Sequence, residues 1–103
     1  GLRERAEASF QEDDWRGAAE LYSEAVAAAR ASLQGRGPSA MTNWDCLKPL
    51  TLNLMGRARS LTEMGRARGN LPASPKVLKA ALEDASAAAT LAKRGGWEDV
   101  AAS

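Results

Sequence analysis

The sequence of 103 residues contains no histidine and a single cysteine, Cys46. Without histidine, the commonest general base and metal-binding side chain is missing. One cysteine also excludes the usual zinc ligand sets and any intrachain disulfide. The glycine-containing segment MGRARSLTEMGRARGN carries neither the phosphate-loop nor the dinucleotide-binding pattern. We therefore expect a protein that is not an enzyme and that holds neither a metal nor a cofactor.

Residue types that favour β-sheets are also scarce. There is no isoleucine and there are only three valines, whereas alanine is abundant. Strands are typically rich in β-branched and aromatic side chains, and alanine is the strongest helix former. The composition therefore predicts an all-α protein, and the length allows one small domain covering residues 1–103.

Long apolar runs are absent as well. No stretch approaches the 18 or so apolar residues that suggest a membrane-spanning helix, and no secretory signal is visible. The unpaired Cys46 suits a reducing compartment, so we expect a cytoplasmic protein. The chain opens at Gly1 rather than Met, from which we expect a fragment of a longer protein.

Hydrophobic periodicity predicts four helices, over about residues 2–12, 15–34, 46–66 and 76–93. Asp14 and Ser74 are suitable N-cap residues for the second and fourth helices. Residues 35–45 and 67–75 contain Gly, Pro and Asn and read as loops. Pro49 fits the third helix only in its first turn, unless that helix begins at Pro49. Residues 97–103 would begin a short fifth helix.

Residues 2–28 combine small and large apolar side chains at fixed offsets. Small residues let two antiparallel helices approach, and aromatic rings fill the spaces between them. This pattern resembles the tetratricopeptide repeat (TPR), a 34-residue helix–turn–helix unit. The resemblance rests on Ala6, Phe10, Trp15, Ala18, Tyr22 and Ala25.

The second half of the chain repeats the first. ALEDASAAATL, residues 81–91, corresponds to AAELYSEAVAA, residues 18–28. We read one repeat over about 2–34, the loop 35–45, a second repeat over about 46–94, and a C-terminal cap at 97–103. The connections are longer than in the family, and an ordinary alanine-rich helical bundle is the alternative. Two repeats bury little surface, so a longer array, a cap or self-association would supply the missing contacts.

The charge is unevenly distributed. Residues 1–33 carry four basic and seven acidic side chains, whereas residues 34–80 carry eight basic and two acidic ones. A basic middle suggests an acidic ligand, although solvated helix faces would give the same pattern. The two MGRAR copies fall on opposite faces of a helix, and no aromatic residue stands between them to stack on bases. Nucleic acid is therefore not the expected partner.

The resemblance implies a groove lined by the first helix of each repeat and filled by a peptide or helix of a partner protein. Trp44, in a polar segment, would either anchor an interface or fold back over the helix ends. Arg57 is a further candidate contact residue because it lies in the basic segment. Phe10 and Met55 are large and apolar, and such side chains are more often buried in the core than exposed to a ligand. The expected partner-binding residues are Arg3, Glu7, Gln11, Trp44, Leu52, Met55, Arg57 and Arg59.

One branch of the family binds the acidic C-terminal tails of Hsp70 and Hsp90 through a two-carboxylate clamp, and LRERAEASF resembles that branch. Here Arg3 replaces the usual Lys, while Glu7 and Gly56 replace Asn residues. Glu7 would repel a carboxylate, and Gly56 offers no side chain. We expect a protein-interaction scaffold, with a structural or dimerising segment and a degenerate co-chaperone domain as alternatives.

Overall fold

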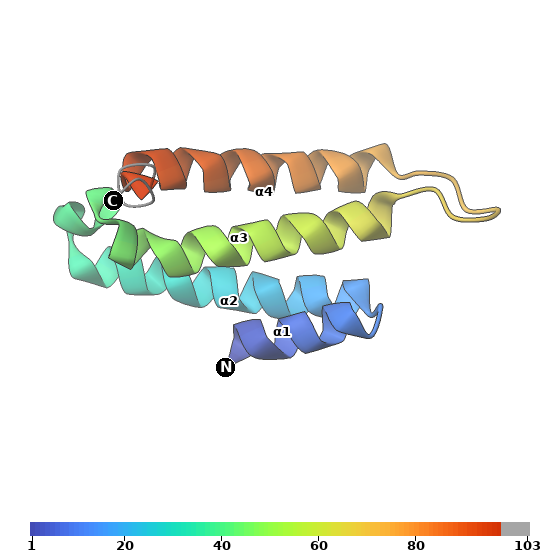
Figure 1. Cartoon of the computed structure of the whole chain (residues 1–103), viewed down its shortest axis with the longest axis horizontal. Helices are drawn as coiled ribbons and strands as arrows, with labels where there is room; N and C mark the ends of the chain where they lie inside the picture. Colours follow the sequence, from blue (N-terminus) through green and yellow to red (C-terminus); the bar gives the residue numbers. More distant parts are fainter. Residues whose placement is uncertain (98–103) are drawn as a thin grey trace.

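A computed structural model describes residues 1–97 of the chain, and this part is helical throughout apart from its connections (Figure 1). Each helix runs antiparallel to the one before it, and the four stack side by side in chain order. The all-α, helix–turn–helix architecture expected from the sequence is thereby confirmed. Its elements are α1 (Leu2–Gln11), α2 (Trp15–Arg36), the 3-10 helix η1 (Pro38–Thr42), α3 (Trp44–Gly65) and α4 (Pro75–Arg94).

Two helix starts follow from the capping residues that the sequence indicated. The Asp14 carboxylate accepts a hydrogen bond from Gly17 N at 3.0 Å, and the Ser74 hydroxyl accepts one from Val77 N at 3.4 Å. Both satisfy amide groups that the first helical turn leaves without partners. Pro75 then occupies the first turn of α4, where its missing N–H costs little.

The connection between α2 and α3 differs from the expected loop at 35–45. Gly35 does not end α2, η1 forms inside the loop, and α3 begins at Trp44 rather than near residue 46. The Asn43 side chain accepts from Asp45 N at 2.9 Å, which starts the helix early. Trp44 is therefore a helical residue, not a loop residue.

Pro49 lies in the second turn of α3, so both expectations for it were wrong. The ring removes one hydrogen bond, the one to the carbonyl of Asp45. Asp45 and Pro49 are exposed, so water can satisfy that carbonyl and the helix continues. The expected fifth helix and cap at 97–103 lie outside the described residues from 98 onward.

The buried faces of α2, α3 and α4 meet in one core, which consists of Val26, Leu33, Ala40, Leu47, Leu50, Leu54, Ala88 and Leu91. A second cluster of Ala6, Ala18 and Tyr22 joins α1 to α2. The helical spacing of the fourth helix predicts one apolar stripe of Leu78, Ala81, Ala85, Ala88 and Ala92. Ala81 and Ala88 are buried, but Ala85 is exposed. Asp84 is buried although no stripe included it.

Close helix packing depends on two glycines of α3. A Cβ at Gly56 would overlap the ring of Tyr22 on α2, and one at Gly65 would come within 2.9 Å of Leu78 on α4. Glycine therefore lets α3 approach both neighbours. Tyr22 fills the space beside Gly56 and is 1% exposed.

Candidate functional site

A concavity of about 480 Å³ opens between α1 and α3, over α2. We call it the α1–α3 groove. Its walls carry two arginines and one glutamate, its floor is Tyr22 against Gly56, and two apolar side chains of α3 line its other side. The lining residues are Arg3, Glu7, Tyr22, Leu52, Met55, Gly56 and Arg59.

The charged groups of this groove act on the Tyr22 hydroxyl. Burial raises the pKa of Tyr22 above its ordinary value, and the negative charge of Glu7 raises it further. The positive charges of Arg59 and Arg3 act in the opposite direction. Two cations and one anion therefore face a neutral hydroxyl, which leaves the groove with a single net positive charge.

Arg59 is held in place by an aromatic ring of α1. Its guanidinium carbon lies 4.4 Å from the centroid of the Phe10 ring, a cation–π arrangement. The contact fixes the stem of Arg59 without using its hydrogen-bond donors. Phe10 is itself half-buried and does not line the groove. It therefore positions the arginine rather than touching a ligand.

A second concavity of about 550 Å³ lies between α3 and α4, which we call the α3–α4 groove. It has no charged side chain in its lining and shares Leu52 and Met55 with the α1–α3 groove. Met55 is 54% exposed, so this large apolar side chain is accessible from both grooves. The lining consists of Trp44, Thr51, Leu52, Met55, Ala58, Ala85, Ala88, Ala89, Ala92 and Trp97.

The two grooves bring most of the expected partner-binding residues together. Five of them, Arg3, Glu7, Leu52, Met55 and Arg59, line the α1–α3 groove. Trp44 lines the α3–α4 groove and also packs against the core. Gln11 is exposed at the end of α1 and belongs to the lining of neither groove.

Arg57 lies away from both grooves. Its guanidinium donates hydrogen bonds to both carboxylate oxygens of Asp84 on α4 and one to the Ser23 hydroxyl on α2 at 3.3 Å. The hydrogen bonds to Asp84 raise the pKa of Arg57, while burial lowers it. Arg57 thus joins three helices inside the fold.

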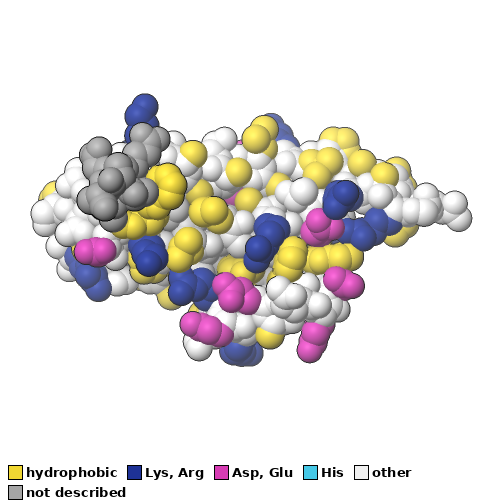
Figure 2. Space-filling model, viewed as in Figure 1, with side chains coloured by type: hydrophobic (Ala, Val, Ile, Leu, Met, Phe, Trp, Pro, Cys, Tyr) yellow, Lys and Arg dark blue, Asp and Glu magenta, His cyan; other side chains and the backbone are white. Residues whose placement is uncertain are grey.

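Other cations of the basic segment are also engaged within the chain. Arg66 and Arg68 pair with Glu63 at 3.0 and 2.7 Å, and Arg68 stacks over Trp15 at 3.9 Å. Burial favours a raised pKa for Glu63, but the hydrogen bonds from these two arginines lower it. Figure 2 accordingly shows basic, acidic and apolar side chains interspersed on one face of the molecule.

Several residues that line the two grooves were not among the expected partner-binding residues. Tyr22 was assigned to the helix-pairing pattern alone, and its contact with Gly56, 34 residues away, is visible only in the structure. The exposed alanines of α4, such as Ala89, gave no signal because their spacing fits a core stripe equally well.

Residues 1–97 show neither a cluster of metal-binding side chains nor a membrane-spanning helix. No group of three or more Cys, Asp or Glu side chains there is arranged to hold a metal ion. None of the helices in that range is both long and apolar enough to cross a bilayer. No protein-family model matches the chain, and neither a curated protein nor a solved structure matches it significantly.

Proposed function

We propose that the chain is a non-enzymatic protein-interaction scaffold, built from two TPR-like helix pairs, that binds a peptide or helix of a partner protein. The observation that carries the proposal is the convergence of Arg3, Glu7, Leu52, Met55 and Arg59 on one concavity. These residues come from α1 and α3, the first helix of each pair. The unpaired Cys46 favours a cytoplasmic setting.

The chemistry of the two joined grooves describes the ligand. Apolar side chains would pack on Leu52 and Met55 and extend between α3 and α4, where no charge lines the wall. One acidic group would face Arg3 and Arg59, which favours a partner of acidic character. Such a contact should weaken between low and physiological salt.

The co-chaperone alternative is less favoured on the same geometry. Glu7 lines the same groove as Arg3, so a second carboxylate there would meet a like charge. Gly56 has no side chain, so it offers no amide donor in place of Asn, and the Tyr22 ring occupies the space where a side chain would lie. A ligand with a single acidic group fits better than a tail with two.

A peptide-display selection against the intact chain tests the proposal. Selected peptides should bind the unaltered protein and lose at least tenfold in affinity to Met55→Glu, which places a charge where the two grooves meet. Leu82→Glu is the matched control, because Leu82 is 67% exposed on α4 and lines neither groove. The proposal would be contradicted if peptide affinity were unchanged by Met55→Glu, or if both variants reduced it equally.

Self-association is the second candidate, and the exposure of Met55 and Leu82 favours it. Sedimentation equilibrium of the same variants separates the two functions. A tight dimer that Met55→Glu dissociates would assign this surface to a second copy of the chain. A monomer at all concentrations leaves the grooves free for a partner.

A further inference from the structure

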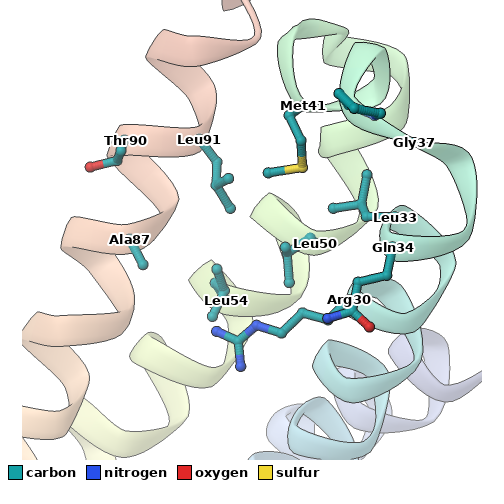
Figure 3. A pocket seen from close by; sticks show the side chains of 11 residues that line it. Arg30, Leu33, Gln34, Gly37, Met41, Leu50, Leu54, Ala87, Thr90 and Leu91 are labelled. Atoms are coloured by element: carbon teal, nitrogen blue, oxygen red, sulfur yellow. The ribbon is translucent and has the colours of Figure 1, made fainter.

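A third groove, of about 670 Å³, lies between α2 and α4 with α3 as its floor and η1 at one end. None of its residues lines the two grooves described above. Figure 3 shows side chains from all four elements directed into it. We call it the α2–α4 groove, and it is lined by Arg30, Leu33, Gln34, Gly37, Pro38, Met41, Leu50, Leu54, Ala87, Thr90 and Leu91.

The floor of the α2–α4 groove is made of branched aliphatic side chains and one thioether. Leu33, Leu50 and Leu91 point toward one another around the sulfur of Met41 (Figure 3). The polar side chains Gln34 and Thr90 stand at the rim, and the hydroxyl of Thr90 points away from the leucines. The interior therefore offers dispersion contacts and no hydrogen-bonding side chain.

Arg30 is the one charged residue in this lining. Its side chain extends from α2 along the groove, with the guanidinium directed toward Leu54 (Figure 3). Within residues 1–97, Arg30 forms no ion pair and no side-chain hydrogen bond. The guanidinium of Arg30, which is exposed and has no partner in that range, is therefore available to an anion.

We propose that the α2–α4 groove binds a single-chain anionic amphiphile, a medium-chain fatty acid, with its carboxylate on Arg30 and its alkyl chain over Met41, Leu50 and Leu91. An aliphatic floor with one cation at its edge matches a ligand that has one anionic end and an otherwise apolar body. A pocket in which a few polar groups orient a mostly apolar ligand is the common form of small-molecule sites.

The dimensions of the groove set the chain length. Arg30 to Gly37 covers about 10 Å along α2 at the helical rise. An extended chain advances about 1.2 Å per bond, so about eight bonds fit. Octanoate therefore matches the groove, and longer chains would extend beyond η1 into water.

A peptide suits this groove less well. An extended peptide carries an N–H and a C=O in every residue, and the floor supplies no side-chain partner for them. An alkyl chain has no polar groups to satisfy.

Binding of sodium octanoate to the intact chain, below its micellar range, provides the test. Calorimetry and methyl NMR should detect saturable binding, with shifts confined to Leu33, Met41, Leu50, Leu54 and Leu91. Hexanoate lacks two methylenes and should bind about 15-fold more weakly, because each buried methylene contributes about fourfold. Shifts spread over all three grooves, or affinity independent of chain length, would overturn the proposal.

The role of Arg30 is tested with Arg30→Gln and a neutral ligand. The variant should weaken octanoate binding about three- to fivefold, as expected for a partly exposed ion pair, and leave 1-octanol binding unchanged. Arg16→Gln, an exposed arginine on the same helix and outside every groove lining, is the control. An equal effect on octanoate and octanol would remove the carboxylate contact from the account.

The location is tested by filling the groove. Ala87→Leu places a larger side chain in the α2–α4 groove and should abolish octanoate binding, whereas Ala89→Leu, in the α3–α4 groove, should not. Unaltered binding by a folded Ala87→Leu variant would contradict the site. Met55 lines the α1–α3 and α3–α4 grooves but not the α2–α4 groove, so Met55→Glu should leave octanoate binding intact. Loss of peptide binding and loss of octanoate binding are therefore separate outcomes.

Discussion

Arg57 of α3 and Asp84 of α4 form a two-point ion pair, in which Nε donates to Oδ2 at 2.7 Å and Nη2 to Oδ1 at 2.8 Å. The two side chains are 21% and 12% exposed, so water screens the pair only weakly. The planar guanidinium matches both carboxylate oxygens, which fixes the relative position of the two helices. Ser23 extends the contact to α2.

Replacing one partner should therefore destabilise the fold substantially. Asp84→Ala leaves the Arg57 guanidinium mostly buried without its counter-charge, and we expect a loss of about 2–3 kcal/mol in the free energy of unfolding. Urea denaturation measures the effect. The double variant Arg57→Met/Asp84→Leu should recover most of the loss, since it removes both charges together.

Glu83→Ala is the matched control for this ion pair, because Glu83 neighbours Asp84 on α4 but is exposed. Its effect should stay within about 0.5 kcal/mol. A similar cost for Glu83→Ala and Asp84→Ala would mean that the loss of a negative charge from α4, not the ion pair with Arg57, accounts for the effect.

The sequence contained enough information to predict the helices and most of their buried faces. Caps such as Asp14 and Ser74 act over three residues, so local pattern is sufficient to locate them. The early start of α3 was missed because Asn43 and Asp45 are equally suitable N-cap residues by type, and only the hydrogen bond from Asp45 N to Asn43 decides between them. Local signals therefore gave the elements but not all of their ends.

The site was predicted in part, for a related reason. Residues of α1 and α3 that face one groove follow from repeat spacing, as Arg3 and Arg59 illustrate. Arg57 stands only two positions from Arg59, yet it pairs with Asp84, 27 residues away. Residues two positions apart on a helix point about 200° apart, so Arg59 faces the α1–α3 groove while Arg57 faces α4. Pairings at such separation leave no trace in local pattern.

The contact between Gly56 and Tyr22 predicts an unusual cost for a small substitution. Gly56→Ala would place a methyl group inside the Tyr22 ring, and α2 and α3 would have to separate. We expect a loss of about 2–3 kcal/mol, despite the higher helix propensity of alanine. Thermal or urea denaturation measures it, and Tyr22→Leu in the same background should reduce the loss.

The same substitution at Gly35 supplies the comparison. Gly35 lies within α2 and a Cβ there would meet no atom within 4 Å. Gly35→Ala should therefore stabilise the protein by about 0.5–1 kcal/mol. Equal effects at Gly35 and Gly56 would contradict the close approach of α2 and α3.

The titration of Tyr22 reports on the charges of the α1–α3 groove. Because the folded-state pKa of Tyr22 is raised, its neutral form contributes stability that is present below the ordinary value of about 10 and is lost as pH rises through the folded value. Tyr22 is the only tyrosine, so tyrosinate absorbance follows it directly. Unfolding in urea should return the pKa to its ordinary value.

Two substitutions in this groove should move the Tyr22 pKa in opposite directions. Glu7→Gln removes a negative charge and should lower it, whereas Arg59→Gln removes a positive charge and should raise it. Arg5→Gln, an exposed arginine of α1 outside the groove lining, should leave it unchanged. Shifts of the same sign for Glu7→Gln and Arg59→Gln would refute the arrangement described for the groove.

Asn53 offers a test in which removing polarity should stabilise the fold. It is 6% exposed on α3, and its Oδ1 atom is buried with no hydrogen-bond partner. Asn53→Leu keeps the branched shape and removes the unpaired oxygen, so we expect a gain of about 1 kcal/mol in denaturant unfolding. Thr51→Val is the contrasting variant: the Thr51 hydroxyl donates to the Leu47 carbonyl at 2.9 Å, so its removal should cost about 0.5–1 kcal/mol. If Asn53→Leu instead destabilises the protein as much as Thr51→Val, the expectation that the unpaired Asn53 oxygen costs stability is wrong.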